Sequence, residues 1–345
     1  MEIGLVTDVF ADKDLDGLLK TCTDLRLKQL EFSCGNYTGG KFFNVDKMLN
    51  DSTHRDEIIT KIKDHNFKIS ALSCHGNPIA PGPYGKQHDE ITRKTIKLAS
   101  VLKIDKIICL SGCAGGPGDS NPNWIVTAWP PEKGKILEWQ WNEVLVPYWK
   151  DVANYAENLG VKICFELHGG DMVYNVPTTH RIRDQASKNI GANFDPSHLI
   201  WMGGDPVQMV KNLGEAVFYV HIKDVKIDPV QKSLNTLLDT TWFADVNGRS
   251  WNFCIPGHGH DERWWSEFLL ALRSIGYEDV LSIEHEDCSL GRKEGMRLTI
   301  EFLERILINE TVDYEWSKEK INQLLELWKK GIPEEEVSKI DKQQN

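Results

Sequence analysis

The stretch ICFELHGG, residues 163–170, decides the fold, because a short apolar run ends there in a carboxylate, Glu166. Three later stretches repeat this pattern of an apolar run that ends in a residue able to bind a divalent cation. They are GANFDPSH (191–198) with Asp195, FYVHIKD (218–224) with His221 and LSIEHED (281–287) with Glu284. In an α/β barrel the strands deliver such side chains to one mouth, where the loops begin. Four such strand ends therefore predict a sheet that closes on itself around a site.

Eight segments of the chain are short, rich in Ile, Val, Leu, Phe and Cys, and separated by helical patterns, which is typical of buried parallel strands. They are residues 3–9, 27–33, 68–74, 106–112, 161–167, 190–195, 217–223 and 279–285. We predict an α/β fold, a (β/α)8 TIM barrel. The alternative is a doubly wound open sheet, which normally carries a Gly-rich turn after its first strand. The sequence TDVFADKD (7–14) is no such turn.

The length of 345 residues allows one large domain with additions. We predict a barrel over residues 1–310 and a C-terminal helical extension over residues 311–345. Two connections are longer than a barrel needs, residues 113–135 after the fourth strand and residues 226–260 after the seventh.

Both long connections carry aromatic residues, Trp124 and Trp129 in the first and Trp242, Trp251 and Phe253 in the second. Tryptophan on a loop is typical of a contact with a ligand or a partner. We predict that Trp124 and Trp129 bind substrate. The alternative is that these loops pack as a lid on their own barrel.

Composition limits the classes of partner. A formal net charge of -11 repels phosphate backbones, so we expect no nucleic-acid partner. The N-terminus lacks the pattern of a signal peptide and no apolar run approaches about 18 residues, so we expect a cytoplasmic protein with no membrane partner. The eight cysteines are dispersed without a CxxC pair, which indicates reduced thiols in the core.

The strand-end residues form a hard, oxygen-rich donor set with one imidazole, which suits Mn²⁺, Mg²⁺ or Co²⁺ better than a thiolate-bound zinc. Because side chains two residues apart share a face of a strand, His168 lies on the face of Glu166, and Lys223 on the face of His221. Several charged residues in buried strands require compensation by a metal or by one another. The alternative to a metal is a buried salt-bridge network.

The motifs FExHG, NxDPSH, HxKD and xIE, in this order over residues 161–286, resemble the xylose isomerase-like barrels, the family of sugar phosphate isomerases and epimerases. The resemblance implies a divalent metal, Mn²⁺ by our expectation, with Mg²⁺, Co²⁺ and Zn²⁺ as alternatives. It implies these metal ligands: Glu166, Asp195, His221 and Glu284. It also implies that His198 and Lys223 contact the substrate and that His75, in CHGNP, lies near the sugar, unless His75 is only a strand-end histidine.

The resemblance further implies chemistry next to a carbonyl, in which a metal stabilises an enediolate while a protein group takes the C–H proton. Glu166 and Glu284 can serve as paired acid and base, and His168 is an additional candidate base. Among the family, the chain looks most like the catalytic α subunits of C-glycoside deglycosidases, lyases that expel the aglycone from a 3-oxo sugar. These enzymes work with a small β subunit, and we expect an oligomer. The alternative is a ketose epimerase or isomerase.

Two other interpretations receive less support from the sequence. The phosphodiester-cleaving branch of these barrels needs many histidines and a basic surface, whereas this chain is acidic and has 11 histidines. In PGHGHD (256–261), His258 and His260 could form a second metal site, but Gly257 and Gly259 favour a simple turn before the last helix.

Overall fold

Eight parallel strands close into a barrel, as the sequence predicts, in the order β1-β10-β7-β6-β5-β4-β3-β2. The strands are β1 Glu2–Val6, β2 Gln29–Ser33, β3 Lys68–Ser73, β4 Lys106–Cys109, β5 Lys162–Glu166, β6 Ile190–Phe194, β7 Val217–Ile222 and β10 Val280–Ile283. Each barrel strand pairs in parallel with the barrel strand that precedes it in the sequence. The first and last strands, β1 and β10, close the ring, with Glu2 paired to Val280. The computed structural model describes residues 1–308, 310 and 318–330.

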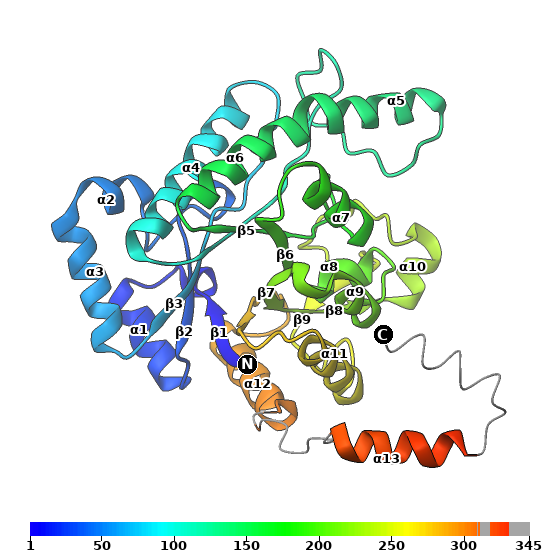
Figure 1. Cartoon of the computed structure of the whole chain (residues 1–345). Coiled ribbons are helices and arrows are strands. Elements are labelled where there is room, and N and C mark those ends of the chain that lie inside the picture. Colours follow the sequence, from blue (N-terminus) through cyan, green and yellow to red (C-terminus); the bar gives the residue numbers. More distant parts are fainter. Residues whose placement is uncertain (309, 311–317, 331–345) are drawn as a thin grey trace. The chain divides into compact units, whose positions relative to one another are not determined.

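Helices surround the barrel (Figure 1). They are α1 Leu15–Asp24, α2 Val45–Asn50, α3 Ser52–Asp64, α4 Pro83–Leu102, α5 Pro131–Trp139, α6 Val146–Asn158, α7 Val176–Gln185, α8 Pro196–Trp201, α9 Pro206–Leu213, α10 Pro229–Asn235, α11 Glu262–Ser274 and α12 Arg292–Ile306. Many begin at a side-chain cap, as where Asp261 accepts the backbone N–H of Trp264.

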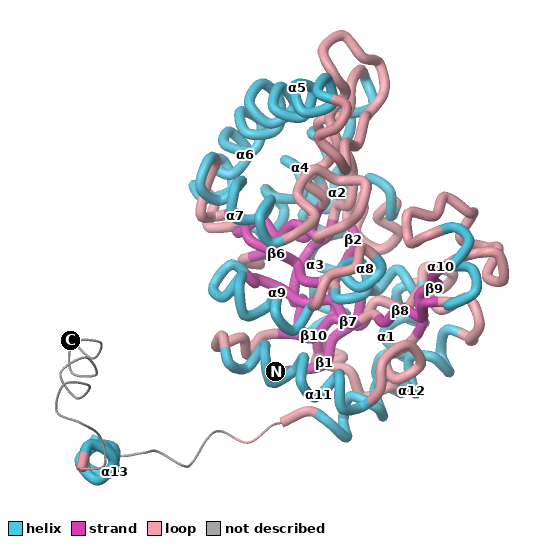
Figure 2. Tube along the Cα trace, turned by 90° about the vertical axis from the view of Figure 1, so that its right-hand side faces the viewer, coloured by secondary structure: helices cyan, strands magenta, loops and turns pink. Residues whose placement is uncertain are grey.

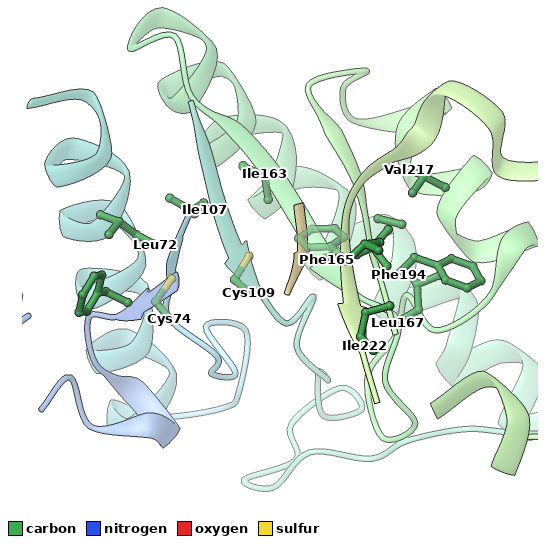
Figure 3. Packing of buried hydrophobic residues seen from close by; sticks show 14 of the residues in the cluster. Leu72, Cys74, Ile107, Cys109, Ile163, Phe165, Leu167, Phe194, Val217 and Ile222 are labelled. Carbon is green, nitrogen blue, oxygen red and sulfur yellow. The ribbon is translucent and has the colours of Figure 1, made fainter. Parts of the chain in front are cut away.

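The main core lies between the barrel and its helices. Alternate strand residues such as Leu72, Ile107, Ile163 and Phe165 are buried in one cluster with apolar helix residues. Figure 3 shows these side chains projecting from neighbouring strands. The intervening residues point into the barrel, so the same period of two that fills the core directs Glu166 inward.

The two long connections differ in structure. The first runs from the end of β4 to α5, whose C-terminal end continues into α6 through a π-helix, Gln140–Leu145. The second contains the helix α10 and a two-stranded antiparallel sheet of β8 Asp224–Ile227 and β9 Trp251–Cys254. This small sheet lies beside the barrel (Figure 2). The second connection is therefore a structured insertion at the barrel mouth.

Residues Met1–Leu307 form one compact unit, and Ile308–Asn345 form another. Within the second unit the described residues contain one helix, α13 Lys318–Lys329. The remainder of the predicted extension, residues 311–317 and 331–345, lies outside the described residues. All eight cysteines are free, and most are buried. In the described part of the chain, every helix is too short or too polar to span a bilayer.

Candidate active site

Four strand ends converge at one mouth of the barrel, as predicted. Glu166 is the last residue of β5, Asp195 follows β6, His221 lies in β7 and Glu284 follows β10. His221 Nδ1 lies 3.8 Å from Glu166 Oε2 and 3.3 Å from Glu284 Oε2. Asp195 points into this cluster because its Oδ1 accepts the backbone N–H of Ser197 and so begins α8.

Two imidazoles border the carboxylates. Candidate ligand atoms of Glu166, Asp195, His198 and Glu284 lie within 4.8 Å of one another. The predicted ligand His221 is not among these four residues, and its Nε2 lies 3.0 Å from Glu31 Oε2, which leaves Nδ1 facing the carboxylates. Metal-binding histidines usually bond a carboxylate through the other ring nitrogen in this way. His198 Nδ1 instead accepts the Trp201 indole N–H at 3.5 Å, so Nε2 of neutral His198 carries the proton.

The unmet hydrogen-bonding capacity of these residues fits a divalent cation. His221 Nδ1 is buried and lacks a hydrogen-bond partner among the described residues, and the buried Asp195 Oδ2 has an ion pair with Lys223 Nζ at 3.2 Å but no hydrogen bond. Such atoms cost free energy unless something compensates for them. Three carboxylates and one imidazole are a suitable donor set for a divalent metal, and the assignment of the four ligands stays a prediction.

Lys223 is buried among the carboxylates, with 2% of its surface exposed. Its Nζ lies 2.6 Å from Glu284 Oε2, 2.8 Å from Glu286 Oε2 and 3.2 Å from Asp195 Oδ2. This ammonium group offsets part of the negative charge at the mouth. The salt-bridge network that the sequence suggested as an alternative is thus present, but it leaves His221 Nδ1 without a hydrogen bond.

His168 lies beside His198, with 4.2 Å between the ring centroids. Its Nδ1 donates a hydrogen bond to the Gly169 carbonyl, and a carbonyl can only accept. Neutral His168 therefore has a free lone pair on Nε2. Gly169 is required here, because a Cβ at this position would lie 2.4 Å from the Trp201 ring. The second half of the FELHGG motif thus seats Trp201 next to both histidines.

A cavity of about 300 Å³ opens beside the carboxylates. Its lining includes Glu284, His75 and Asp8. His75 Nε2 lies 2.6 Å from Glu166 Oε2, whereas Nδ1 is buried without a hydrogen-bond partner among the described residues. Both carboxylate oxygens of Asp8 are also buried and lack a described partner. The cavity thus contains groups able to bond several hydroxyls.

A larger cavity of about 860 Å³ has His168 on its wall and shares three lining residues with the smaller one, His285, Glu286 and Arg292. Its aromatic lining consists of Trp201, Phe243, Trp251 and Phe253. Most of these come from the second long connection.

The two tryptophans predicted to bind substrate lie apart from both cavities. Trp124 lines a separate hollow of about 210 Å³ with Trp141 and Tyr174. Trp129 is 74% exposed. Their role in substrate binding stays a prediction.

Burial and crowding of charge shift the pKa of several groups. Burial raises the pKa of Asp195 and that of Asp8 each to about 7. Burial also opposes ionisation of Glu166, but His75 and His198 hold the pKa of its carboxyl well below its usual range. Burial lowers the pKa of His198 to about 3 and also lowers that of His168. Both rings are therefore neutral near pH 7, as a base or a hydrogen-bond donor requires.

Asp171 gives a testable pH dependence. Burial raises the pKa of its carboxyl from 3.8 to about 8. Because the folded protein holds this proton where the unfolded chain releases it, the free energy of unfolding falls as the pH rises from about 4 to about 8. We expect Asp171→Asn to flatten this fall and to gain about 1–2 kcal/mol over the parent protein at pH 8. Thermal denaturation at several pH values measures the free energy of unfolding of both proteins. Parallel dependence on pH in the two proteins would contradict the role of Asp171.

The site includes residues that the sequence analysis missed. Glu31 on β2 is fully buried, and its Oε2 accepts hydrogen bonds from the Ser282 hydroxyl and the His221 ring. A charged residue within the apolar run QLEFS (29–33) is a signal that could have found it. Asp8 lies two residues after β1, in the 3-10 helix Thr7–Phe10, and its place just beyond an apolar strand is a signal of the same kind.

The interpretation of PGHGHD as a turn fits the structure. His260 Nδ1 lies 2.7 Å from the buried carboxylate Asp224 Oδ1, and His258 is exposed. Within the described residues, the cluster of potential metal ligands found is the one at the barrel mouth.

Comparisons with known proteins agree with the barrel. The sequence model of the xylose isomerase-like TIM barrel family matches residues 31–306. The uncharacterized protein YfiH of Bacillus subtilis is 38% identical over 311 residues, which are 89% of this chain and 99% of that protein. An inosose dehydratase of Geobacillus kaustophilus is 27% identical over 140 residues, 40% of this chain and 44% of that protein. The crystal structure of an IolI protein with a bound zinc atom superposes with a TM-score of 0.61 at 18% identity, covering 89% of this chain and 99% of that one.

Proposed function

Because the chain belongs to the xylose isomerase-like TIM barrel family, whose enzymes process sugars, we propose that it is a divalent-metal-dependent lyase for a 3-oxo glycoside. It removes the proton at C2 and expels the substituent at C1. The observation that carries this proposal is the pair of adjoining cavities at the carboxylate cluster, of about 300 and 860 Å³. These volumes lie near the lower and upper ends of the range for small-molecule sites, so a sugar and a bulky aglycone fit side by side.

Glu166, Asp195, His221 and Glu284 would hold the metal, with Glu31 fixing the ring of His221. A divalent cation bound there supplies Lewis acidity to a ketone oxygen and so makes the adjacent C–H bond more acidic. Similarity to an inosose dehydratase, whose name describes an elimination, supports a lyase, and the zinc in the IolI structure supports a divalent metal. We keep Mn²⁺ as the expected ion.

His168 is placed to take the C2 proton. Its Nε2 lone pair is free because Nδ1 donates to Gly169, and its ring lines the larger cavity, where the aglycone would lie. As the proton leaves C2, the bond between C1 and the aglycone breaks and its electron pair departs with the aglycone. Asp8, His75 and Lys223 would bind the oxygens of the sugar, and His198 would donate its Nε2–H.

A ketose epimerase or isomerase is the second candidate. The smaller cavity alone would hold a free ketose, and Glu166 and Glu284 both lie within 3.8 Å of His221 Nδ1, close enough together to serve as a paired acid and base. Association with a small second subunit, as in C-glycoside deglycosidases, stays a prediction.

The test is substrate consumption. We expect purified protein with Mn²⁺ to release the aglycone from a 3-oxo-C-glycoside and to leave free ketoses unchanged. Epimerisation of ketoses without release of any aglycone would favour the second candidate.

The aromatic contacts can be assigned with a matched pair of exposed residues. Phe243 lines the larger cavity, whereas Trp129 does not. We expect Phe243→Ala to raise KM for a bulky glycoside up to about tenfold, the value of one aromatic contact, and Trp129→Ala to have less effect. The reverse result would place the aglycone against the first long connection, as the sequence analysis predicted.

A further inference from the structure

Arg249 is a buried cation on the wall of the 860 Å³ cavity. It lies in the second long connection, two residues before Trp251, and 6% of its surface is exposed. Among the described residues, none accepts a hydrogen bond from its Nε, and no carboxylate forms an ion pair with its guanidinium. Burying a cation without an anionic partner costs free energy, and an anionic ligand at this position would offset that cost.

The indole ring of Trp251 supports the guanidinium but cannot neutralise it. The guanidinium carbon lies 4.1 Å from the centroid of the Trp251 ring. The same ring stacks on Trp201, with 4.7 Å between centroids and an angle of 5° between planes. The indole ring covers one side of the guanidinium, and a π-face offers no lone pair to accept its N–H groups. The donors at the edge of the guanidinium therefore stay available to a ligand.

The acidic groups near Arg249 are already engaged. Among the residues that line the cavity, Glu286 pairs with Lys223, Asp287 accepts three hydrogen bonds, and Asp228 begins α10 by accepting two backbone N–H groups. Outside the cavity lining, Asp239 attracts Arg249, but its oxygens accept the backbone N–H groups of Thr241 and Ser250.

The other cations on the cavity wall differ from Arg249. Arg292 forms an exposed ion pair with Asp12 at 2.8 Å. Lys226 is exposed, so water solvates its charge. Arg249 is thus the buried cation of this wall, and no ion pair to it is present within the described residues.

We propose that Arg249 binds an oxyanion, a carboxylate or a phosphate, carried by an aromatic group that occupies the larger cavity. A planar guanidinium pairs with either oxyanion through two parallel hydrogen bonds. The aromatic group would contact Phe243 and Phe253, since both faces of Trp251 are covered. Resting on the proposed function, this identifies the substrate class as glycosides whose aglycone is an aryl acid.

Binding of small probes to the metal-loaded protein tests the site directly. Titration calorimetry compares benzoate, phenyl phosphate and neutral benzyl alcohol. We expect at least one of the two anions to bind more tightly than benzyl alcohol, and their ratio identifies the preferred oxyanion. Arg249→Met should weaken the binding of that anion by about ten- to a hundredfold, the usual contribution of hydrogen bonds to a charged group. Binding unchanged in Arg249→Met would place the anion elsewhere, for example on the metal, and overturn the proposal.

Lys226→Met is the matched control, because it removes the same charge from the same cavity at an exposed position. We expect this variant to lose less than about threefold in affinity for the anion. Equal losses in the two variants would show attraction by overall charge and overturn the assignment of Arg249. Thermal denaturation adds a second readout. Arg249→Met should melt no lower than the parent protein, since an unpaired buried charge is removed, whereas a structural role would require a lower melting temperature.

Turnover separates this proposal from the proposed function. With 3-oxo-C-glycosides whose aglycones differ only by a carboxylate, kcat/KM should favour the acid in the parent protein and lose that preference in Arg249→Met. Cleavage of both glycosides without a preference overturns the anion site but retains the lyase. Cleavage of neither, with benzoate binding still dependent on Arg249, overturns the lyase but retains the anion site.

Discussion

Replacing Glu284 by Gln is expected to weaken metal binding by more than about a hundredfold, and turnover should fall with it. This loss exceeds the usual cost of removing a residue that only hydrogen-bonds to a metal ligand. The reason is that Glu284 would contribute an anionic ligand oxygen, 3.3 Å from the His221 nitrogen proposed as a ligand. The fold should persist, because Lys223 keeps its contacts with Asp195 and Glu286. Elemental analysis after dialysis measures the metal, and turnover at a fixed metal concentration measures the activity.

Glu286→Gln is the control for this substitution. It removes the same charge next to the same lysine, at 2.8 Å from Lys223 Nζ, but its side chain is half exposed and lies outside the cluster of ligand atoms. We expect this variant to keep its metal. Full retention of metal and turnover in Glu284→Gln, or equal loss of metal in both variants, would contradict the assignment of Glu284 as a ligand.

Replacing His168 by Ala is expected to lower the rate of elimination by about 10² to 10⁴, the usual contribution of a general base. The metal should stay bound, because the His168 Nδ1 donates to a backbone carbonyl and the ring is not needed as a ligand. The melting temperature should change little, since the side chain is partly exposed. Exchange of deuterium at C2 of the substrate reports proton abstraction separately from departure of the aglycone.

His65→Ala is a suitable control, because His65 also bonds a backbone carbonyl through Nδ1 but lies at the end of α3, outside the site. If His168→Ala exchanges deuterium at the normal rate, His168 is not the base. Glu166 or Glu284 would then take that role, which would also favour the epimerase.

The strand ends of the site could be predicted because each combines two signals, an apolar run and a charged residue at its end. Glu166 and His221 satisfy both, whereas His168 and Lys223 follow the ends of β5 and β7, where the period of two no longer applies. Glu31 lies within its apolar run instead of at the end, and its contact with His221 joins residues 190 positions apart in the chain. Local patterns predict the face of a strand on which a residue lies, but they do not predict which residue of another strand it contacts.

The cavities could not be predicted in the same way. Trp129 and Trp251 both stand in long, aromatic connections, yet one is 74% exposed and the other is buried. The difference arises because β9 pairs with β8 and turns Trp251 onto Trp201, a packing that depends on residues far apart in the chain. The sequence shows that aromatic residues are present, while only the folded insertion decides which of them reach the mouth.

In the proposed function, the barrel provides the reacting groups, and the insertion between β7 and α11 provides selectivity for the aglycone. The residues proposed to hold the metal lie on barrel strands or directly after them, whereas most of the larger cavity is lined by the insertion and by the segment that follows Glu284. Such a division lets the insertion vary in length and sequence without disturbing the barrel beneath it. The proposed function therefore implies that exchange of residues 226–254 between relatives changes the aglycone preference and leaves the proposed metal ligands unchanged.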